Sequence, residues 1–194
     1  MIDITVLKNT FNMKKISLSI ICMAIMFSTS CSNHQKPSAR NNVWGDEDTT
    51  SVTEVKLSGS KVLVPFKRIE SGLAEVQVSL NGVPFNMWWD TGASVTCISL
   101  LELQKLAKEG KISMDDYKGP ALSQIADGST TESAIFTIRE IYIQGQDNKY
   151  LILKDIDAMV SPSAKAPLLI GQNVISNLPK HTFNESDGVI EFEQ

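Results

Sequence analysis

The chain has 194 residues, of which 42% are hydrophobic and 21% are charged, the proportions of one globular domain with a tail. Its formal net charge is −4, and its Lys and Arg residues form no cluster that could contact phosphates, so we expect no nucleic-acid partner. The two histidines, His34 and His181, are isolated from cysteines and carboxylates. No metal site is therefore predicted, and no cofactor is expected.

Residues 1–31 are predicted to be a signal peptide. Met13 and two lysines precede an apolar run over 16–27, which is too short to span a bilayer as a stable anchor. The small residues that follow, ending at Cys31, resemble the lipobox of a bacterial lipoprotein, whose cysteine is lipidated and becomes the mature N-terminus. An ordinary signal peptide with a Ser-rich cleavage site is the alternative. The lipobox resemblance implies lipidation of Cys31 and a lipid-anchored protein in the bacterial cell envelope, facing the periplasm.

Residues 32–60 are polar and rich in turn-forming types, with few large apolar side chains, which predicts a flexible linker. From Lys61 the composition changes to that of a folded domain, predicted to cover 61–194. Once Cys31 is lipidated, Cys97 is the one free thiol of the mature chain. Its apolar neighbours predict a buried structural residue.

Alternating apolar residues predict the first strands of the domain, over 61–66, 74–80 and 83–89. Asn81-Gly82 lies between the last two and is a strong hairpin signal. A short apolar strand is predicted over 95–98. Ser99 then begins a helix as its capping residue, with Glu102 three positions later, and Gly110 ends it.

The second half of the domain consists mainly of short apolar segments. They predict strands over 121–126, 131–138, 141–143, 150–153, 156–160 and 168–171. Asp127-Gly128 lies at the tip of the first hairpin in this set, where Asp127 is first of all a turn former. A short helix is predicted over 172–178, and a terminal hairpin over 183–192. Many short strands and few helices predict a mostly-β domain.

Asp90 directly follows the predicted strand 83–89 and opens the sequence Asp90-Thr91-Gly92-Ala93-Ser94. A carboxylate on a tight turn at the end of a buried strand is partly desolvated, and it keeps one geometry only if neighbouring donors hold it. The small residues after it allow another part of the main chain to approach closely. This element occurs once, because the sequence has no internal repeat.

Three features, in this order, resemble the retropepsin-like aspartic protease family, the retroviral-type proteases of clan AA, in a bacterial lipoprotein form. They are the Asp90 to Ser94 segment, the glycine-bearing hairpin at Asp127-Gly128 in the position of the family's flap, and the segment 168–173. This last segment resembles the family's apolar-apolar-Gly-Arg-Asn/Asp signature, with Gln172 where retroviral enzymes commonly have Arg. The resemblance covers about 61–194 and implies a single closed β domain with one or two short helices.

The resemblance also implies a mechanism in which two carboxylates share one proton and activate a water molecule. Because the chain supplies one such carboxylate, Asp90, the active species is expected to be a homodimer in which Asp90 faces its symmetry mate. The other implied site residues are Thr91, Gly92, Ala93 and Ser94 as loop support, Asp127 and Gly128 at the flap and substrate, and Ile170, Gly171 and Asn173 as loop or dimer support.

Two functions remain open from the sequence. The first is an envelope-located aspartic endopeptidase that acts on protein or peptide substrates. The alternative is a catalytically silent β domain of the same fold that binds a peptide or a protein. The intact Asp90-Thr91-Gly92 favours the enzyme, because a pure binding domain gains nothing from a desolvated aspartate.

Overall fold

The computed structural model describes residues 54–124 and 130–193. The predicted signal peptide with Cys31, most of the predicted linker, and the predicted flap residues Asp127 and Gly128 lie outside these ranges. The described residues confirm a mostly-β domain, in which eleven strands form one sheet. Within the described ranges there is no helix of the length and hydrophobicity that a bilayer crossing requires.

The strands are, in chain order, β1 (Glu54–Leu57), β2 (Lys61–Arg68), β3 (Ala74–Leu80), β4 (Val83–Trp89), β5 (Thr96–Ser99), β6 (Tyr117–Gln124), β7 (Thr130–Gln144), β8 (Tyr150–Ser161), β9 (Leu169–Ile170), β10 (His181–Asn184) and β11 (Val189–Glu193). The helices are α2 (Leu100–Lys108), the 3₁₀ helix η1 (Met114–Asp116) and α3 (Gln172–Ile175).

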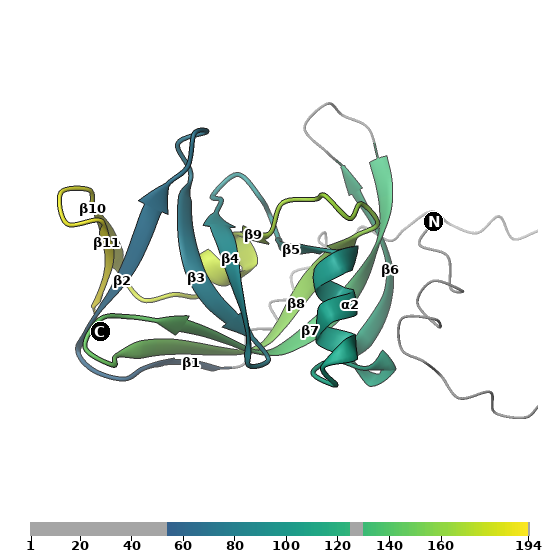
Figure 1. Ribbon diagram of the computed structural model, residues 1–194, viewed down its shortest axis with the longest axis horizontal. Helices are drawn as coiled ribbons and strands as arrows, with labels where there is room; N and C mark the ends of the chain where they lie inside the picture. Colours follow the sequence, from purple (N-terminus) through teal and green to yellow (C-terminus); the bar gives the residue numbers. More distant parts are fainter. Residues whose placement is uncertain (1–53, 125–129, 194) are drawn as a thin grey trace, which may run out of the picture.

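The sheet closes on itself. Its strand order is β10-β11-β2-β3-β4-β9-β5-β8-β7-β6, and an additional pairing between β3 and β7 returns the path to β3. The strands β3, β4, β9, β5, β8 and β7 therefore surround a common interior, and β2, β11 and β10 continue from β3 as an extension. Figure 1 shows this extension at the opposite end of the molecule from α2.

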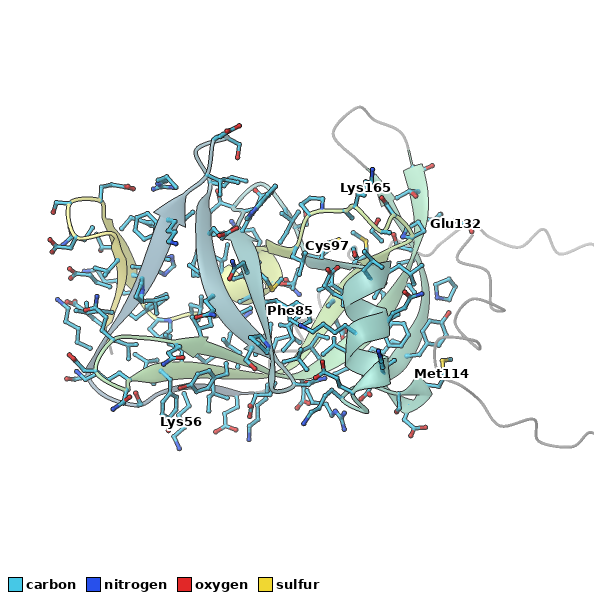
Figure 2. All side chains as sticks on the ribbon, in the orientation of Figure 1. Lys56, Phe85, Cys97, Met114, Glu132 and Lys165 are labelled. Carbon is cyan, nitrogen blue, oxygen red and sulfur yellow. The ribbon has the colours of Figure 1, made fainter. Side chains whose placement is uncertain are left out.

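The interior is filled by the alternating apolar residues of the strands. The largest fully buried side chains are Phe136, Phe192, Leu80, Met87, Ile98, Leu103, Leu106, Ile138, Ile141, Ile143, Leu151 and Leu153. Two of these, Leu103 and Leu106, come from α2, which packs against β5 and β8 and begins with the predicted capping box of Ser99 and Glu102. Charged side chains such as Lys56 and Lys165 point away from the ribbon (Figure 2).

The structure differs from the sequence-based expectation in several elements. The two predicted strands 131–138 and 141–143 are one continuous strand, β7, and the helix predicted over 172–178 is the shorter α3, Gln172–Ile175. Residues 54–57, predicted to belong to the flexible linker, form β1 and pair antiparallel with β8 from Glu54 opposite Lys154 to Leu57 opposite Leu151. The two predicted strands 150–153 and 156–160 are one continuous strand, β8. The apparent break is Asp155, which keeps its place in the strand with a positive φ of 54°.

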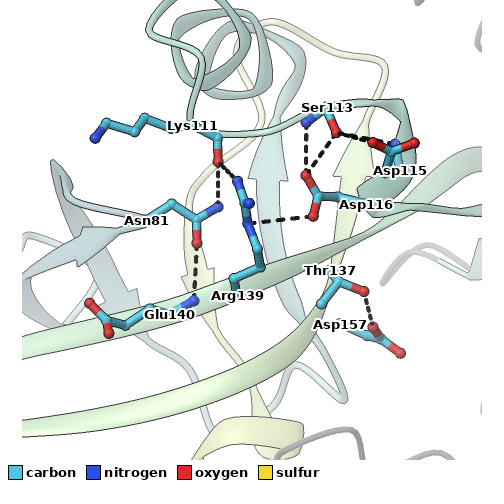
Figure 3. A network of polar contacts seen from close by, with 9 residues as sticks. All are labelled: Asn81, Lys111, Ser113, Asp115, Asp116, Thr137, Arg139, Glu140 and Asp157. Atoms are coloured by element: carbon cyan, nitrogen blue, oxygen red, sulfur yellow. Dashed lines mark hydrogen bonds and ion pairs between the residues drawn. The ribbon is translucent and has the colours of Figure 1, made fainter.

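A polar network fixes the base of the long β6–β7 hairpin (Figure 3). The Lys111 carbonyl, after α2, accepts hydrogen bonds from Asn81 Nδ2 at 2.9 Å and Arg139 Nη2 at 2.6 Å. Asn81 also accepts from the Glu140 amide at 3.0 Å, and Arg139 Nε lies 3.5 Å from Asp116 Oδ1. The β3–β4 turn, the end of α2, η1 and β7 are thereby held together at one point.

Candidate active site

Asp90 lies where β4 ends, and two neighbouring strands fix that end. β4 pairs antiparallel with β3 along its length and parallel with β9, with Trp88 opposite Leu169 and Trp89 opposite Ile170. The Asp90 amide donates to the Ile170 carbonyl at 3.1 Å, which extends the ladder by one residue. The Cα position of Asp90 is therefore set by the sheet rather than by a loose loop.

The turn after Asp90 holds the carboxylate in place. The Gly92 amide donates to Asp90 Oδ1 at 2.8 Å, and the Ala93 amide donates to the Asp90 carbonyl at 3.3 Å. Asp90 is half-buried, whereas Thr91, Gly92 and Ser94 are exposed. Within the described residues, the second oxygen, Oδ2, has no hydrogen bond, and no other carboxylate contacts Asp90. One oxygen is thus anchored, and the other is left for a partner or solvent.

The start of α3 is hydrogen-bonded to three carbonyl oxygens of the same turn. The Gln172 amide donates to the Ala93 carbonyl at 2.8 Å, and the Asn173 amide donates to the Ser94 carbonyl at 3.1 Å. The Gln172 side chain adds a third bond, from Nε2 to the Thr91 carbonyl at 3.0 Å. Two segments about 80 residues apart in sequence therefore form one unit.

Asn173 joins this unit to the core through its side chain. Its Oδ1 accepts from the Thr96 amide at 2.8 Å and from Thr96 Oγ1 at 2.9 Å, and its Nδ2 donates to the Asp157 carbonyl at 2.8 Å. Thr96 Oγ1 in turn accepts from the Gly171 amide at 3.3 Å. All the polar atoms of the Asn173 amide group are used, so this side chain connects β5, β8 and α3.

The structure thus brings together most of the predicted site residues. Ile170 and Asn173 are hydrogen-bonded to residues of the 90–94 turn, and Gly171 lies against Val95, directly after that turn. Sequence reasoning did not identify Thr96, whose only signal was a hydroxyl in a short apolar strand, and it did not assign Gln172 a contact with the turn. The flap residues Asp127 and Gly128 and the lipidation candidate Cys31 lie outside the described residues.

An aromatic cluster supports the turn from the interior. Trp89, the residue before Asp90, is buried and makes edge-type contacts with His181 and Phe183, with ring centroids 5.4 and 6.0 Å away, and a tilted contact with Phe192 at 6.1 Å. The neighbouring Trp88 is only half-buried, which fits the alternation of strand faces. The end of β4 is therefore packed against the β10–β11 hairpin.

Two surface hollows lie elsewhere on the molecule. They have volumes of about 240 and 350 Å³, share Gln77, and lie over β2, β3, β4 and β7. No residue of the 90–94 turn lines either of them.

In the described part of the chain, no group of three or more His, Cys, Asp or Glu side chains is placed to hold a metal ion. The geometry around Asp90 is a partly exposed carboxylate on a rigid turn, suited to proton exchange with a water molecule.

Comparisons with known proteins indicate the family of this chain. No curated protein sequence matches the chain. Among solved structures, the chain is similar to a retropepsin-like aspartic protease from Rickettsia conorii, with 15% sequence identity, a TM-score of 0.47, and coverage of 72% of this chain and 91% of that one. The family model of the gag-polyprotein putative aspartyl proteases matches residues 76–177, which is more than half of the chain and includes both the Asp90 turn and the start of α3. The chain therefore belongs to this family of retropepsin-like proteins.

Proposed function

We propose that this protein is an aspartic endopeptidase that hydrolyses peptide bonds through a water molecule activated by a pair of Asp90 carboxylates. The observation that carries the proposal is the way Asp90 is presented. Its main chain is fixed by β9, its Oδ1 is held by the Gly92 amide at 2.8 Å, and its Oδ2 forms no hydrogen bond within the described residues. A rigidly held, half-exposed carboxylate with one free oxygen is what such a reaction requires.

The proposed reaction needs a second carboxylate. One carboxylate takes a proton from the water, whose oxygen attacks the carbonyl carbon of the scissile bond, while the protonated partner donates a hydrogen bond to the carbonyl oxygen. The C–N bond then breaks as the leaving nitrogen takes a proton from the carboxylate pair, which leaves a carboxylic acid and an amine as products. The chain contains one Asp-Thr-Gly element. We therefore propose a homodimer in which the free Oδ2 of Asp90 faces its mate across a two-fold axis, and the exposed Thr91 and Gly92 lie in the interface.

The catalytic assignment is tested by Asp90→Asn. The purified protein should cleave fluorescein-labelled casein, and pepstatin should inhibit the cleavage. Asp90→Asn should abolish it while leaving the unfolding midpoint nearly unchanged, because the amide is isosteric and still accepts the Gly92 hydrogen bond through its oxygen. Asp187→Asn, at an exposed turn, is the matched control and should retain full activity. Turnover by clean Asp90→Asn protein would refute the role of Asp90, and a fully folded but inactive wild type would favour a silent binding domain.

The dimer is tested by dilution. If the site exists only between two copies, specific activity should fall as the protein is diluted below its dissociation constant, and peptide-like inhibitors should shift the mass seen by sedimentation toward the dimer. Specific activity that is independent of concentration, together with a monomeric mass, would contradict the two-fold site.

We further propose that the protein is anchored by lipid on Cys31 in the bacterial cell envelope, facing the periplasm. The support is the sequence alone, in which a basic start and an apolar run lead to small residues and Cys31. The wild type should take up labelled fatty acid and sediment with membranes, whereas Cys31→Ser should not be labelled and should move to the soluble envelope fraction. A soluble, unlabelled wild type would instead support an ordinary signal peptide.

A further inference from the structure

We propose that Gln172 is a positioning residue for Asp90 and acts through the peptide bond between Thr91 and Gly92. Its effect on catalysis rests on the proposed function, whereas its effect on the geometry of the turn can be measured without any activity. The starting observation is that a single residue of α3 makes two hydrogen bonds to the turn. Its amide bonds to the Ala93 carbonyl at 2.8 Å, and its side-chain Nε2 bonds to the Thr91 carbonyl at 3.0 Å.

The Thr91 carbonyl and the Gly92 amide belong to the same peptide unit, which is planar and trans. The direction of one therefore fixes the direction of the other. Because the Gly92 amide is the group that donates to Asp90 Oδ1 at 2.8 Å, the Gln172 side chain controls the donor that orients the carboxylate. The connection runs from Gln172 Nε2 to the Thr91 oxygen, through the planar peptide, and from the Gly92 N–H to Asp90.

Without the Gln172 bond, the bond from the Gly92 amide to Asp90 is the one hydrogen bond within the described residues that would hold this peptide unit. It is flanked by a glycine, which has no Cβ to restrict its dihedral angles, and both Thr91 and Gly92 are exposed. A flip of the peptide plane would turn the Gly92 N–H away from the Asp90 carboxylate and present a carbonyl oxygen instead. The Gln172 hydrogen bond opposes that flip. Hydrogen bonds linked in a chain also polarise one another, so the Gln172 donor strengthens the Gly92 donor.

The residue type suits this role. Gln172 is half-buried and neutral, so it orients the peptide without adding a formal charge near the carboxylate. The backbone bond from the Gln172 amide to Ala93 does not depend on the side chain, and it keeps α3 and the turn together when the side chain is changed. A substitution at this position should therefore alter the orientation of one peptide while the fold persists.

The test compares Gln172→Met, which is close in size and has no donor, with Gln172→Arg, which keeps N–H donors at the end of a longer side chain. Gln146→Met, in the exposed β7–β8 turn, is the matched control. The first measurement is hydrogen exchange of the Gly92 amide by NMR in the intact protein. We expect exchange to accelerate about fivefold or more in Gln172→Met, in line with the loss of one net hydrogen bond, and to stay near the wild-type rate in Gln172→Arg and in the control.

The second measurement is kinetic. In Gln172→Met, kcat should fall by about 10-fold to 100-fold with KM within about twofold, since a misplaced carboxylate slows the reaction without removing a substrate contact. Unchanged Gly92 exchange in Gln172→Met would overturn the proposal, and so would an equal acceleration in Gln172→Met and Gln172→Arg. A lower unfolding midpoint with normal Gly92 exchange would show a merely structural role and would also overturn it. An inactive wild type would refute the proposed function alone, because the exchange measurement would still decide the role of Gln172.

Discussion

Gly171 lies directly against the main chain of Val95. A Cβ atom at position 171 would stand 2.2 Å from the Val95 carbonyl carbon and 2.4 Å from its oxygen, distances that no side chain can occupy. Because these are backbone atoms at the entrance to β5, a rotamer change cannot relieve the collision. The close approach explains how α3 comes near enough to bond the carbonyls of the 90–94 turn, since a larger residue would push the two segments apart.

Gly171→Ala should therefore destabilise the domain. We expect the free energy of unfolding to fall by about 1–3 kcal/mol, the usual cost of inserting atoms into a filled site, and more if the turn is displaced. Gly59→Ala is the control, because the nearest atom to its Cβ would be a Lys149 side-chain carbon 3.8 Å away, and its effect should stay within about 0.5 kcal/mol. Urea denaturation measures both. Equal effects of the two substitutions would contradict the steric argument.

Asn173→Ala should also be costly, for a reason of hydrogen bonding rather than space. The substitution leaves the Thr96 amide, the Thr96 hydroxyl and the Asp157 carbonyl without the partner they have in the wild type. Each polar group left unsatisfied in the interior costs about 1–3 kcal/mol, and water can reach part of this site, so we expect a loss of about 2–4 kcal/mol. Asn86→Ala is the control, because Asn86 is exposed and makes a single long bond of 3.4 Å to Glu75. A loss below 1 kcal/mol for Asn173→Ala would show that its bonds are replaced by water.

The sequence predicted the features that depend on local pattern. The hairpin of β3 and β4 followed from alternating apolar residues around Asn81-Gly82, and both turn residues indeed have positive φ, 49° and 88°. The position of Asp90 at the end of a buried strand followed from the same pattern. The alternation also required that only one of Trp88 and Trp89 face the core, and the register of β4 selects Trp89.

The sequence did not predict the features that depend on distant pairing. β1 contains two charged residues among four, and it is held by β8, about a hundred positions away along the chain, so its own composition resembles a linker. The contact of Gln172 with Thr91 exists because β9 lies parallel to β4, a neighbourhood that no local pattern reveals. The same holds for Thr96, which acquires its role only when α3 is placed beside β5.

Cys97 should behave as a structural thiol with a pH signature. Burial raises the pKa of its thiol from 9.0 to about 11. In the folded protein, it should react with a disulfide reagent at pH 8 far more slowly than in the unfolded protein, where the thiol ionises normally. The unfolded chain loses this proton at a lower pH than the folded one. The free energy of unfolding is therefore unaffected by this thiol below pH 9 and falls as the pH rises from 9 toward 11.

The matched variant for this measurement is Cys97→Ala. Other groups titrate in the same range, so the quantity to compare is the difference in slope of the free energy of unfolding between pH 9 and pH 11. The wild type should lose up to about 2–3 kcal/mol more than the variant over this range. Identical slopes, or fast reaction of the folded thiol at pH 8, would contradict the burial of Cys97.

Lys118 should stabilise the domain by compensating the buried Asp157. Its Nζ lies 2.7 Å from Asp157 Oδ1 and 2.9 Å from Oδ2, and Thr137 Oγ1 lies 3.2 Å from Oδ1. The Asp157 side chain is 7% exposed, so removing the cation leaves a carboxylate poorly solvated, whereas Lys118 itself is 49% exposed and water can partly replace it. Balancing these effects, we expect Lys118→Met to lower the free energy of unfolding by about 1–3 kcal/mol.

Two further variants separate compensation of charge from loss of side-chain packing. Lys154→Met breaks the ion pair with Glu54, which is 3.4 Å long and half-exposed on both sides, and should cost less than about 1 kcal/mol. The double variant Lys118→Met/Asp157→Asn removes the carboxylate as well as its cation, so it should recover part of the stability lost in Lys118→Met alone. If the double variant is instead the less stable of the two, the cost of Lys118→Met comes from packing and not from an uncompensated charge.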